Sequence, residues 1–140
     1  MALTPAAMDR KIDEHFGFEA ADNVEGVLAT LAPDVDHDIV GWPSGPTHGR
    51  QNARPFYEAL FADLAEGKVT CIKRLYGESF LIDESLWEGS APGRPFGLHG
   101  RGRPLRFRLL HVVEFSSRGD IQREQVWVDL ASIIQQLPQN

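Results

Sequence analysis

The clearest pattern of apolar and polar positions lies in residues 107–129, FRLLHVVEFSSRGDIQREQVWVD. Apolar and polar side chains alternate on both sides of a polar stretch at residues 116–120, which predicts a long β-hairpin. Because successive side chains of a strand point to opposite faces, His111 lies on the apolar face of the first arm. The pattern therefore places a titratable ring where the core is expected. The other residues of that face are Phe107, Leu109, Val113 and Phe115.

Apolar residues at three- and four-residue spacing predict four helices elsewhere in the chain. Capping residues mark their starts, and Gly or Pro marks their ends. Asp22, for example, can cap the second helix while Glu25 completes a capping box. In chain order the predicted helices begin at Pro5, Asp22, Arg50 and Asp129 and end at Gly17, Pro33, Gly67 and Pro138.

Period-two alternation predicts three further strands, over residues 35–41, 69–76 and 79–88. A Gly- and Pro-rich segment at residues 89–104 follows, and we expect it to be a mobile lid over a pocket. The order of elements describes an α+β domain, with helices packed on one face of a curved antiparallel sheet. Such a sheet leaves a cavity between its layers. Residues 1–140 suit a single domain of this kind.

The composition limits the classes of partner. The chain has 14 Lys+Arg and 20 Asp+Glu, a formal charge of -6, which disfavours nucleic acids and anionic membrane surfaces. Arginines gather between residues 94 and 108, but they fall in a predicted loop and on an outer strand face. No run reaches the ~20 apolar residues of a membrane span, and no leader pattern opens the chain. The single cysteine, Cys71, predicts a reducing, cytoplasmic setting and an inert thiol that is at least half buried.

Several local runs resemble the SnoaL-like polyketide cyclases and ester cyclases of the nuclear-transport-factor-two-like superfamily. VDHD at residues 35–38 is similar to that family's first strand with its histidine. GPTHGRQNARPFYEAL resembles the family's entry into its third helix, and RGDIQREQVWVDLASIIQQL resembles its closing strand and helix. The resemblance covers nearly the whole chain. It implies a single domain in which the sheet and helices form a cone-shaped pocket.

Cyclases of this family are implied to close a polyketide ring by an intramolecular aldol condensation without a cofactor. A histidine and an aspartate on the last two strands are implied to act as the acid-base pair. The histidine position falls on His111, whereas the aspartate position falls on Val126, which cannot accept a proton. Either Glu124 or another carboxylate supplies the base, or the chain does not catalyse that reaction. The superfamily also resembles isomerases, dehydratases, epoxide hydrolases and binding proteins, so the fold alone does not decide the function.

The hairpin turn decides whether His111 and Glu124 share a face. A two-residue loop at residues 118–119 would pair His111 with Val126. Glu124 would then lie diagonally from His111 on the same face, within hydrogen-bonding reach. A three-residue loop at residues 117–119, with a left-handed glycine, would shift the pairing and turn Glu124 away. We favour the two-residue loop, because it brings together the positions at which the family's acid and base are implied to meet.

The candidate catalytic residues are His111 and Glu124, as an acid-base pair. His111 could equally be a core histidine with one polar partner. Two histidines and a carboxylate could also suggest a metal site, but His37, His111 and Glu124 lack the close spacing of metal ligands, so we predict no metal and no cofactor. Tyr57 and Trp127 suit an ordinary core as well as a pocket. The candidate substrate-binding residues are His37, Trp42, Tyr57, Val126 and Trp127.

Three functions fit these patterns. The first is a cofactor-independent, cyclase-like or isomerase-like enzyme that abstracts a proton from a small, mainly apolar carbonyl compound, with His37 orienting the substrate. The second is a small-molecule-binding protein that uses the same pocket without chemistry. The third is a dimerisation module. We expect a homodimer in any case, because the helices cannot cover both faces of the sheet.

Overall fold

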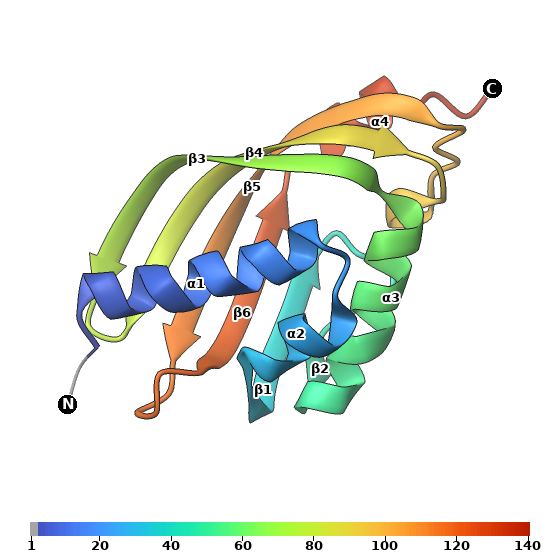
Figure 1. Ribbon diagram of the computed structural model, residues 1–140. Coiled ribbons are helices and arrows are strands. Elements are labelled where there is room, and N and C mark those ends of the chain that lie inside the picture. Colours follow the sequence, from blue (N-terminus) through green and yellow to red (C-terminus); the bar gives the residue numbers. More distant parts are fainter. Residues whose placement is uncertain (1–2) are drawn as a thin grey trace.

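A computed structural model describes residues 3–140 as one curved six-stranded sheet with the first three helices on its hollow face (Figure 1). The helices are α1 (Pro5–Ala20), α2 (Val24–Ala29), α3 (Arg54–Asp63) and α4 (Leu130–Gln136), and short 3-10 turns are η1 (Arg50–Ala53) and η2 (Pro95–Gly97). The strands are β1 (Leu31–Val40), β2 (Thr47–His48), β3 (Ala65–Gly77), β4 (Phe80–Ala91), β5 (Arg103–Phe115) and β6 (Ile121–Val128). The predicted α+β class is confirmed.

The strands lie in the order β2-β1-β6-β5-β4-β3. The four strands from β3 to β6 pair in antiparallel fashion, as predicted. β1 instead runs parallel to β6, so the sheet is mixed at this edge and the wholly antiparallel prediction is wrong there. β2 was not predicted. Its two residues pair with β1 in the loop that precedes η1, and such a short bridge leaves no periodic signal in the sequence.

The first two helices differ at their ends from the prediction. α1 continues through Gly17 to Ala20. A helical glycine destabilises by only about 1 kcal/mol, which the packing of Phe18 against the core can offset. The N-cap of α2 is Asn23 and not Asp22, because the Asn23 side chain accepts the backbone N–H of Gly26 at 2.9 Å.

Two predicted helix stops lie inside strands. Pro33 belongs to β1, in the stretch between Leu31 and Asp36 where the pairing with β6 shifts register. A proline is tolerated at such an irregularity because no regular ladder hydrogen bond is lost. α3 ends at Asp63, and Gly67 lies within β3. Both helices are therefore shorter than their apolar stripes suggested.

The Gly- and Pro-rich connection is shorter than predicted, because β4 extends to Ala91 and β5 begins at Arg103. The backbone N–H of Gly102 donates to the carbonyl of Ala91 at 2.8 Å and joins the two ends of the connection. Within it, η2 carries Phe96, which contributes to the cavity described below. The motion of this connection as a lid stays a prediction.

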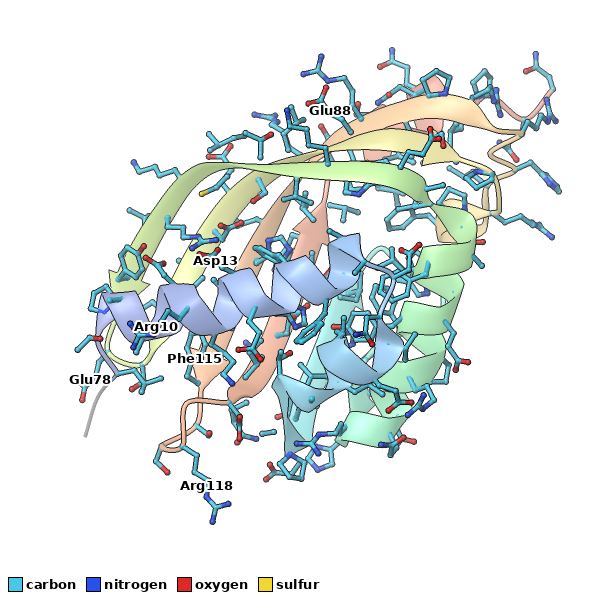
Figure 2. The ribbon with its side chains drawn as sticks, in the orientation of Figure 1. Arg10, Asp13, Glu78, Glu88, Phe115 and Arg118 are labelled. Carbon is cyan, nitrogen blue, oxygen red and sulfur yellow. The ribbon has the colours of Figure 1, made fainter. Side chains whose placement is uncertain are left out.

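The β5–β6 turn is a three-residue loop, so the predicted two-residue loop is wrong. Ser116 donates its backbone N–H to the carbonyl of Asp120 at 2.8 Å, which leaves residues 117–119 as the loop. Gly119 has a φ of +87°, in the left-handed region. Figure 2 shows Arg118 at the tip of this hairpin.

The predicted pairing of His111 with Val126 is nevertheless confirmed. The ladder shifts register next to Phe115, where Gln122 is an extra residue on the second arm. This β-bulge compensates for the extra residue of the loop. Beyond it, Glu124 returns to the face of His111. The structure thus combines the two alternatives. The turn is the three-residue loop, and the pairing along the ladder is the one expected for the two-residue loop.

The left-handed turn residue supports a stability prediction. Gly119→Val should lower the free energy of unfolding by about 1–2 kcal/mol, because a β-branched residue is strained at a positive φ. Urea unfolding followed by circular dichroism measures the change. Gly17→Ala is the matched control, since Gly17 is helical and has open space around its Cα, so this change should stabilise the protein slightly. An unchanged unfolding midpoint for Gly119→Val would contradict the assigned turn.

Buried apolar side chains form two clusters. One lies beneath α1 and α2 and includes Met8 and Ile12, and the other gathers Leu64 and Phe107 near α4. No helix within residues 3–140 is long and apolar enough to cross a bilayer. Cys71 is exposed, so the predicted burial of its thiol is wrong. It lies on β3, the edge strand that is farthest from β1 in the sheet.

Candidate active site

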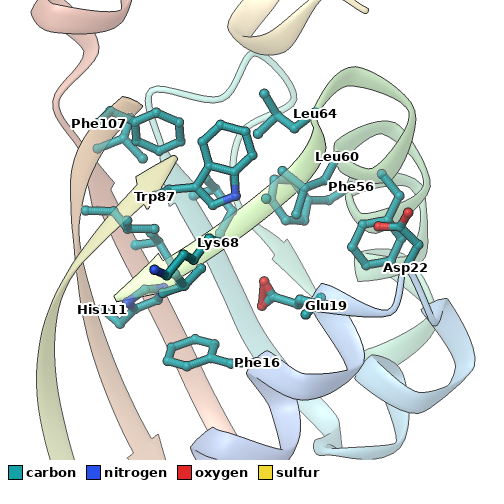
Figure 3. Close-up of a pocket in the computed structure, with 18 of the residues that line it drawn as sticks. Phe16, Glu19, Asp22, Phe56, Leu60, Leu64, Lys68, Trp87, Phe107 and His111 are labelled. Atoms are coloured by element: carbon teal, nitrogen blue, oxygen red, sulfur yellow. The ribbon is translucent and has the colours of Figure 1, made fainter. Parts of the chain in front are cut away.

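A cavity of about 530 Å³ lies between α1, α3 and the sheet (Figure 3). Its volume suits a small organic ligand. Most of its wall is apolar, and charged side chains from α1 and β3 lie among the lining, including Glu19 and Lys68 (Figure 3). The aromatic residues of the wall are Phe16, Trp42, Phe56, Phe61, Trp87, Phe96 and Phe107.

His111 belongs to the wall of this cavity, and only 4% of its surface is exposed. β5 holds it opposite Asp83 of β4 and Val126 of β6, so the three positions form a row across the sheet. The Nδ1 atom of His111 is 3.2 Å from Oδ1 of Asp83. Because an ionised carboxylate only accepts hydrogen bonds, Nδ1 is the donor. Nε2 is then the nitrogen that carries the lone pair of the neutral ring.

Asp83 is fully buried and is held by more than the histidine. Ser85 Oγ donates to Oδ1, and Arg74 Nε donates to Oδ2 at 2.7 Å. The Arg74 guanidinium also contacts Asp9 at 3.0 Å and Asp13 at 2.7 Å, both on α1. Figure 2 shows Asp13 on the side of α1 that faces β3 and β4. Arg74 therefore connects Asp83, which orients His111, to α1.

The environment of Asp83 gives its stability contribution a defined pH dependence. Burial raises the pKa of Asp83, but hydrogen bonds from His111, Arg74 and Ser85 outweigh it and hold the pKa well below its usual range. Asp83 therefore stabilises the fold above pH ~4, and this contribution is lost as the pH falls toward the folded-state pKa. In Asp83→Asn, the fall of unfolding free energy between pH ~4 and pH ~2 should be shallower than in the wild type. Urea unfolding at a series of pH values checks this, and an unchanged acid slope would contradict it.

A second titratable cluster joins α1 to β6. His15 Nε2 is 2.9 Å from Glu19 Oε1 and 3.0 Å from Glu124 Oε2. Burial lowers the pKa of His15, but the charges of Glu124 and Glu19 outweigh burial and raise it to about 10. Burial raises the pKa of Glu124, whereas the charge of His15 outweighs this and lowers it to about 2. Glu124 is thus a carboxylate at neutral pH, held by His15.

His37 and Tyr57 form a third buried polar pair, with His37 Nε2 2.9 Å from the Tyr57 hydroxyl. His37 Nε2 is also 4.0 Å from Glu124 Oε1. Burial lowers the pKa of His37 and raises that of Tyr57, so both side chains are neutral at pH 7. His37 lines a separate cavity of about 190 Å³. Neither residue belongs to the described lining of the larger cavity.

The profile of one protein family, described as SnoaL-like polyketide cyclase, matches residues 9–137. The chain belongs to the SnoaL-like polyketide cyclase family. The matched range includes the whole described lining of the larger cavity and both histidine clusters beside it. The resemblance seen in the motifs is therefore confirmed. A comparison with curated proteins finds no match.

Solved structures of NTF2-like proteins share the fold of this SnoaL-like chain. An NTF2-like protein of unknown function from Burkholderia pseudomallei is 20% identical, with a TM-score of 0.78 over 94% of this chain and 98% of its own. TsrD from Streptomyces laurentii is 14% identical, with a TM-score of 0.84 over 99% of each chain. An LEH-like epoxide hydrolase of M. tuberculosis is 14% identical, with a TM-score of 0.73 over 94% of this chain and 90% of its own. At these identities the likeness establishes the fold alone.

The structure separates the predicted site residues of this SnoaL-like chain into three groups. Trp42, His111, Glu124 and Val126 line the larger cavity, whereas His37 and Tyr57 are buried beside it. Trp127 is 48% exposed, so its predicted place in the pocket is wrong. Neighbouring residues of a strand point to opposite faces, and Val126 takes the inward position.

The predicted pair of His111 and Glu124 is replaced by two separate pairs. Among residues 3–140, the ionic partner of His111 is Asp83, and the close partner of Glu124 is His15. Neither Asp83 nor His15 was predicted, although the sequence held a signal for each. Asp83 alternates with Leu81 on the buried face of its strand, and His15 continues the stripe of Met8 and Ile12 on α1.

Proposed function

We propose that this SnoaL-like protein is a cofactor-independent acid-base enzyme that abstracts a proton next to the carbonyl group of a small, mainly apolar compound. The observation that carries the proposal is the hydrogen bond between His111 and the buried Asp83 at the wall of an apolar cavity. A histidine whose second nitrogen is oriented by a carboxylate is a common general base.

Asp83, in the row across the sheet, can take the place of the aspartate that the family resemblance implies. Val126 occupies that position on β6 and cannot accept a proton. Asp83 occupies the corresponding position on the other side of His111, on β4. The proposal therefore assigns the role of the implied aspartate on β6 to Asp83 on β4.

The reaction follows from these roles. Nε2 of His111 takes the proton from the α-carbon, and the C–H electron pair becomes the double bond of an enolate. Asp83 accepts the Nδ1–H and stabilises the imidazolium that forms. The imidazolium then returns the proton. Where the enolate is conjugated with a C=C bond, the γ-carbon takes the proton, which is isomerisation. Where the enolate attacks a second carbonyl group of the same molecule, the alkoxide so formed takes the proton, which is ring closure. The apolar wall excludes water and strengthens each of these electrostatic interactions.

The second candidate function is a binding protein that uses the same cavity. Val126 favours it, because the strand position of the family's implied base carries no ionisable group.

Native mass spectrometry of the purified chain tests the substrate class that we propose for the enzyme. The proposal expects a small, mainly apolar adduct with a carbonyl group. A polar adduct without a carbonyl group would contradict the proposed substrate class.

We also propose a homodimer built on the outer face of the sheet. Leu110 and Trp127 are cross-strand partners on that face, and they are 37% and 48% exposed. Adjacent exposed apolar side chains favour burial between two copies. Light scattering at micromolar concentration should report a dimer, and the double variant Leu110→Glu and Trp127→Glu should report a monomer. Ile134→Glu on α4, where Ile134 is 51% exposed, is the control that should remain dimeric. A monomeric wild type would contradict the proposal.

A further inference from the structure

Three donor atoms converge where α1 passes over β6. They are Nε2 of His15, Oε1 of Glu19 and Oε2 of Glu124, and they all lie within 4.8 Å of one another. His15 Nε2 and Glu124 Oε2 are completely buried, and within residues 3–140 neither has a partner with hydrogen-bond geometry. His15 Nε2 therefore lies 2.9 Å from Glu19 and 3.0 Å from Glu124 without the geometry of a hydrogen bond to either carboxylate.

Thr30 fixes the tautomer of His15. The Thr30 hydroxyl donates its single hydrogen to the carbonyl of Val27 at 2.6 Å. Its oxygen, 2.7 Å from His15 Nδ1, must then accept a hydrogen bond from Nδ1–H. Nε2 is consequently the nitrogen that can give up its proton, and its lone pair then faces both carboxylates. Metal-binding histidines are held in the same way, by a hydrogen bond from the nitrogen that does not bind the metal.

Charge also favours a cation at this point. Two carboxylates bring two negative charges to His15, and a protonated ring neutralises only one of them. A divalent cation that displaces the ring proton balances both. The separations fit as well, because bonds of about 2.1 Å at right angles place neighbouring ligand atoms roughly 3.0 Å apart.

We propose that His15, Glu19 and Glu124 bind one divalent first-row transition-metal ion at the wall of the cavity. An imidazole with two carboxylates suits ions such as Zn²⁺ and Mn²⁺, which accept nitrogen and oxygen ligands. Glu19 and Glu124 both line the larger cavity, so an ion can enter from it. These three residues differ from the metal-site candidates considered in the sequence, which were His37, His111 and Glu124. His111 of that set pairs with Asp83. The site is independent of the proposed proton transfer, since it uses neither His111 nor Asp83.

Isothermal titration calorimetry of the chelator-treated full chain with ZnCl₂ and with MnCl₂ tests the site. We expect saturable binding of one ion per chain for at least one metal. Glu19→Gln and Glu124→Gln should each abolish saturable binding. Glu19 is only partly buried, so its variant keeps the test valid even where Glu124→Gln does not fold. Thr30→Val should weaken binding by about 10-fold to 100-fold, because it removes the partner that orients the ring.

His48→Ala is the matched control. His48 forms an exposed pair with Asp36, with 2.8 Å between the ring and the carboxylate, and it lies on β2, outside the cluster. This variant should bind the ion as the wild type does. Two results would overturn the proposal. One is a wild type that binds neither metal, and the other is saturable binding that survives in the Glu19→Gln variant.

Discussion

Asp83→Asn is expected to lower the rate constant of α-proton exchange, kcat, by about 10²-fold to 10⁴-fold while KM changes little. Asp83 accepts the Nδ1–H of His111 and so keeps the lone pair on Nε2. An asparagine amide can present its own N–H to Nδ1, which favours the tautomer with the proton on Nε2. The ring then lacks its base on the cavity side, although the cavity itself is unchanged.

The control for this variant is Asp36→Asn. Asp36 and His48 are also an aspartate-histidine pair, but the pair is exposed and lies outside the cavity. Its removal should leave kcat unchanged. Circular dichroism of both variants verifies that they are folded. A folded Asp83→Asn variant that retains wild-type kcat would show that Asp83 does not orient a catalytic histidine.

His15→Ala is expected to lower the free energy of unfolding by about 3–5 kcal/mol in chelator-treated protein at pH 7. The variant leaves the carboxylate of Glu124 buried without its cation, and Glu124 is only 2% exposed. It also removes a fully buried ring from the core. Urea unfolding followed by tryptophan fluorescence measures the loss.

The exposed pair of His48 and Asp36 again provides the comparison. Because solvent screens its charges, His48→Ala should leave the unfolding midpoint almost unchanged. An equal, small effect of His15→Ala and His48→Ala would contradict the importance of the buried cluster. The same would follow if the double variant His15→Ala and Glu124→Gln were no more stable than His15→Ala alone, since removal of the unpaired charge should restore part of the loss.

The local patterns predicted the elements well, and the reason is visible at the hairpin. Alternation along β5 places His111 inward whatever the turn, so this prediction needed no knowledge of the loop. The turn itself was predicted incorrectly, because a loop of three residues and a bulge at Gln122 together mimic the register of a two-residue loop. The pairing of His111 with Val126 was correct since the two irregularities compensate.

The partners within the site were harder to predict, because they depend on which strands are neighbours. Asp83 lies 28 residues before His111, across a Gly- and Pro-rich connection that hides the register of β4 against β5. His15 meets Glu124 only because α1 crosses the sheet over β6, a packing that no single segment encodes. The parallel pairing of β1 with β6 is likewise a contact between distant segments.

The most direct test of the proposed function is the exchange of α-protons of β-tetralone, a small apolar ketone, in deuterium oxide followed by proton NMR. Wild-type protein should accelerate the exchange above the buffer rate with saturation, and His111→Gln should reduce that acceleration by at least about 10²-fold. His111 is the group that takes the proton, so no other variant addresses the claim as closely. Equal exchange by wild type and His111→Gln would contradict the acid-base role and leave the cavity as a binding site.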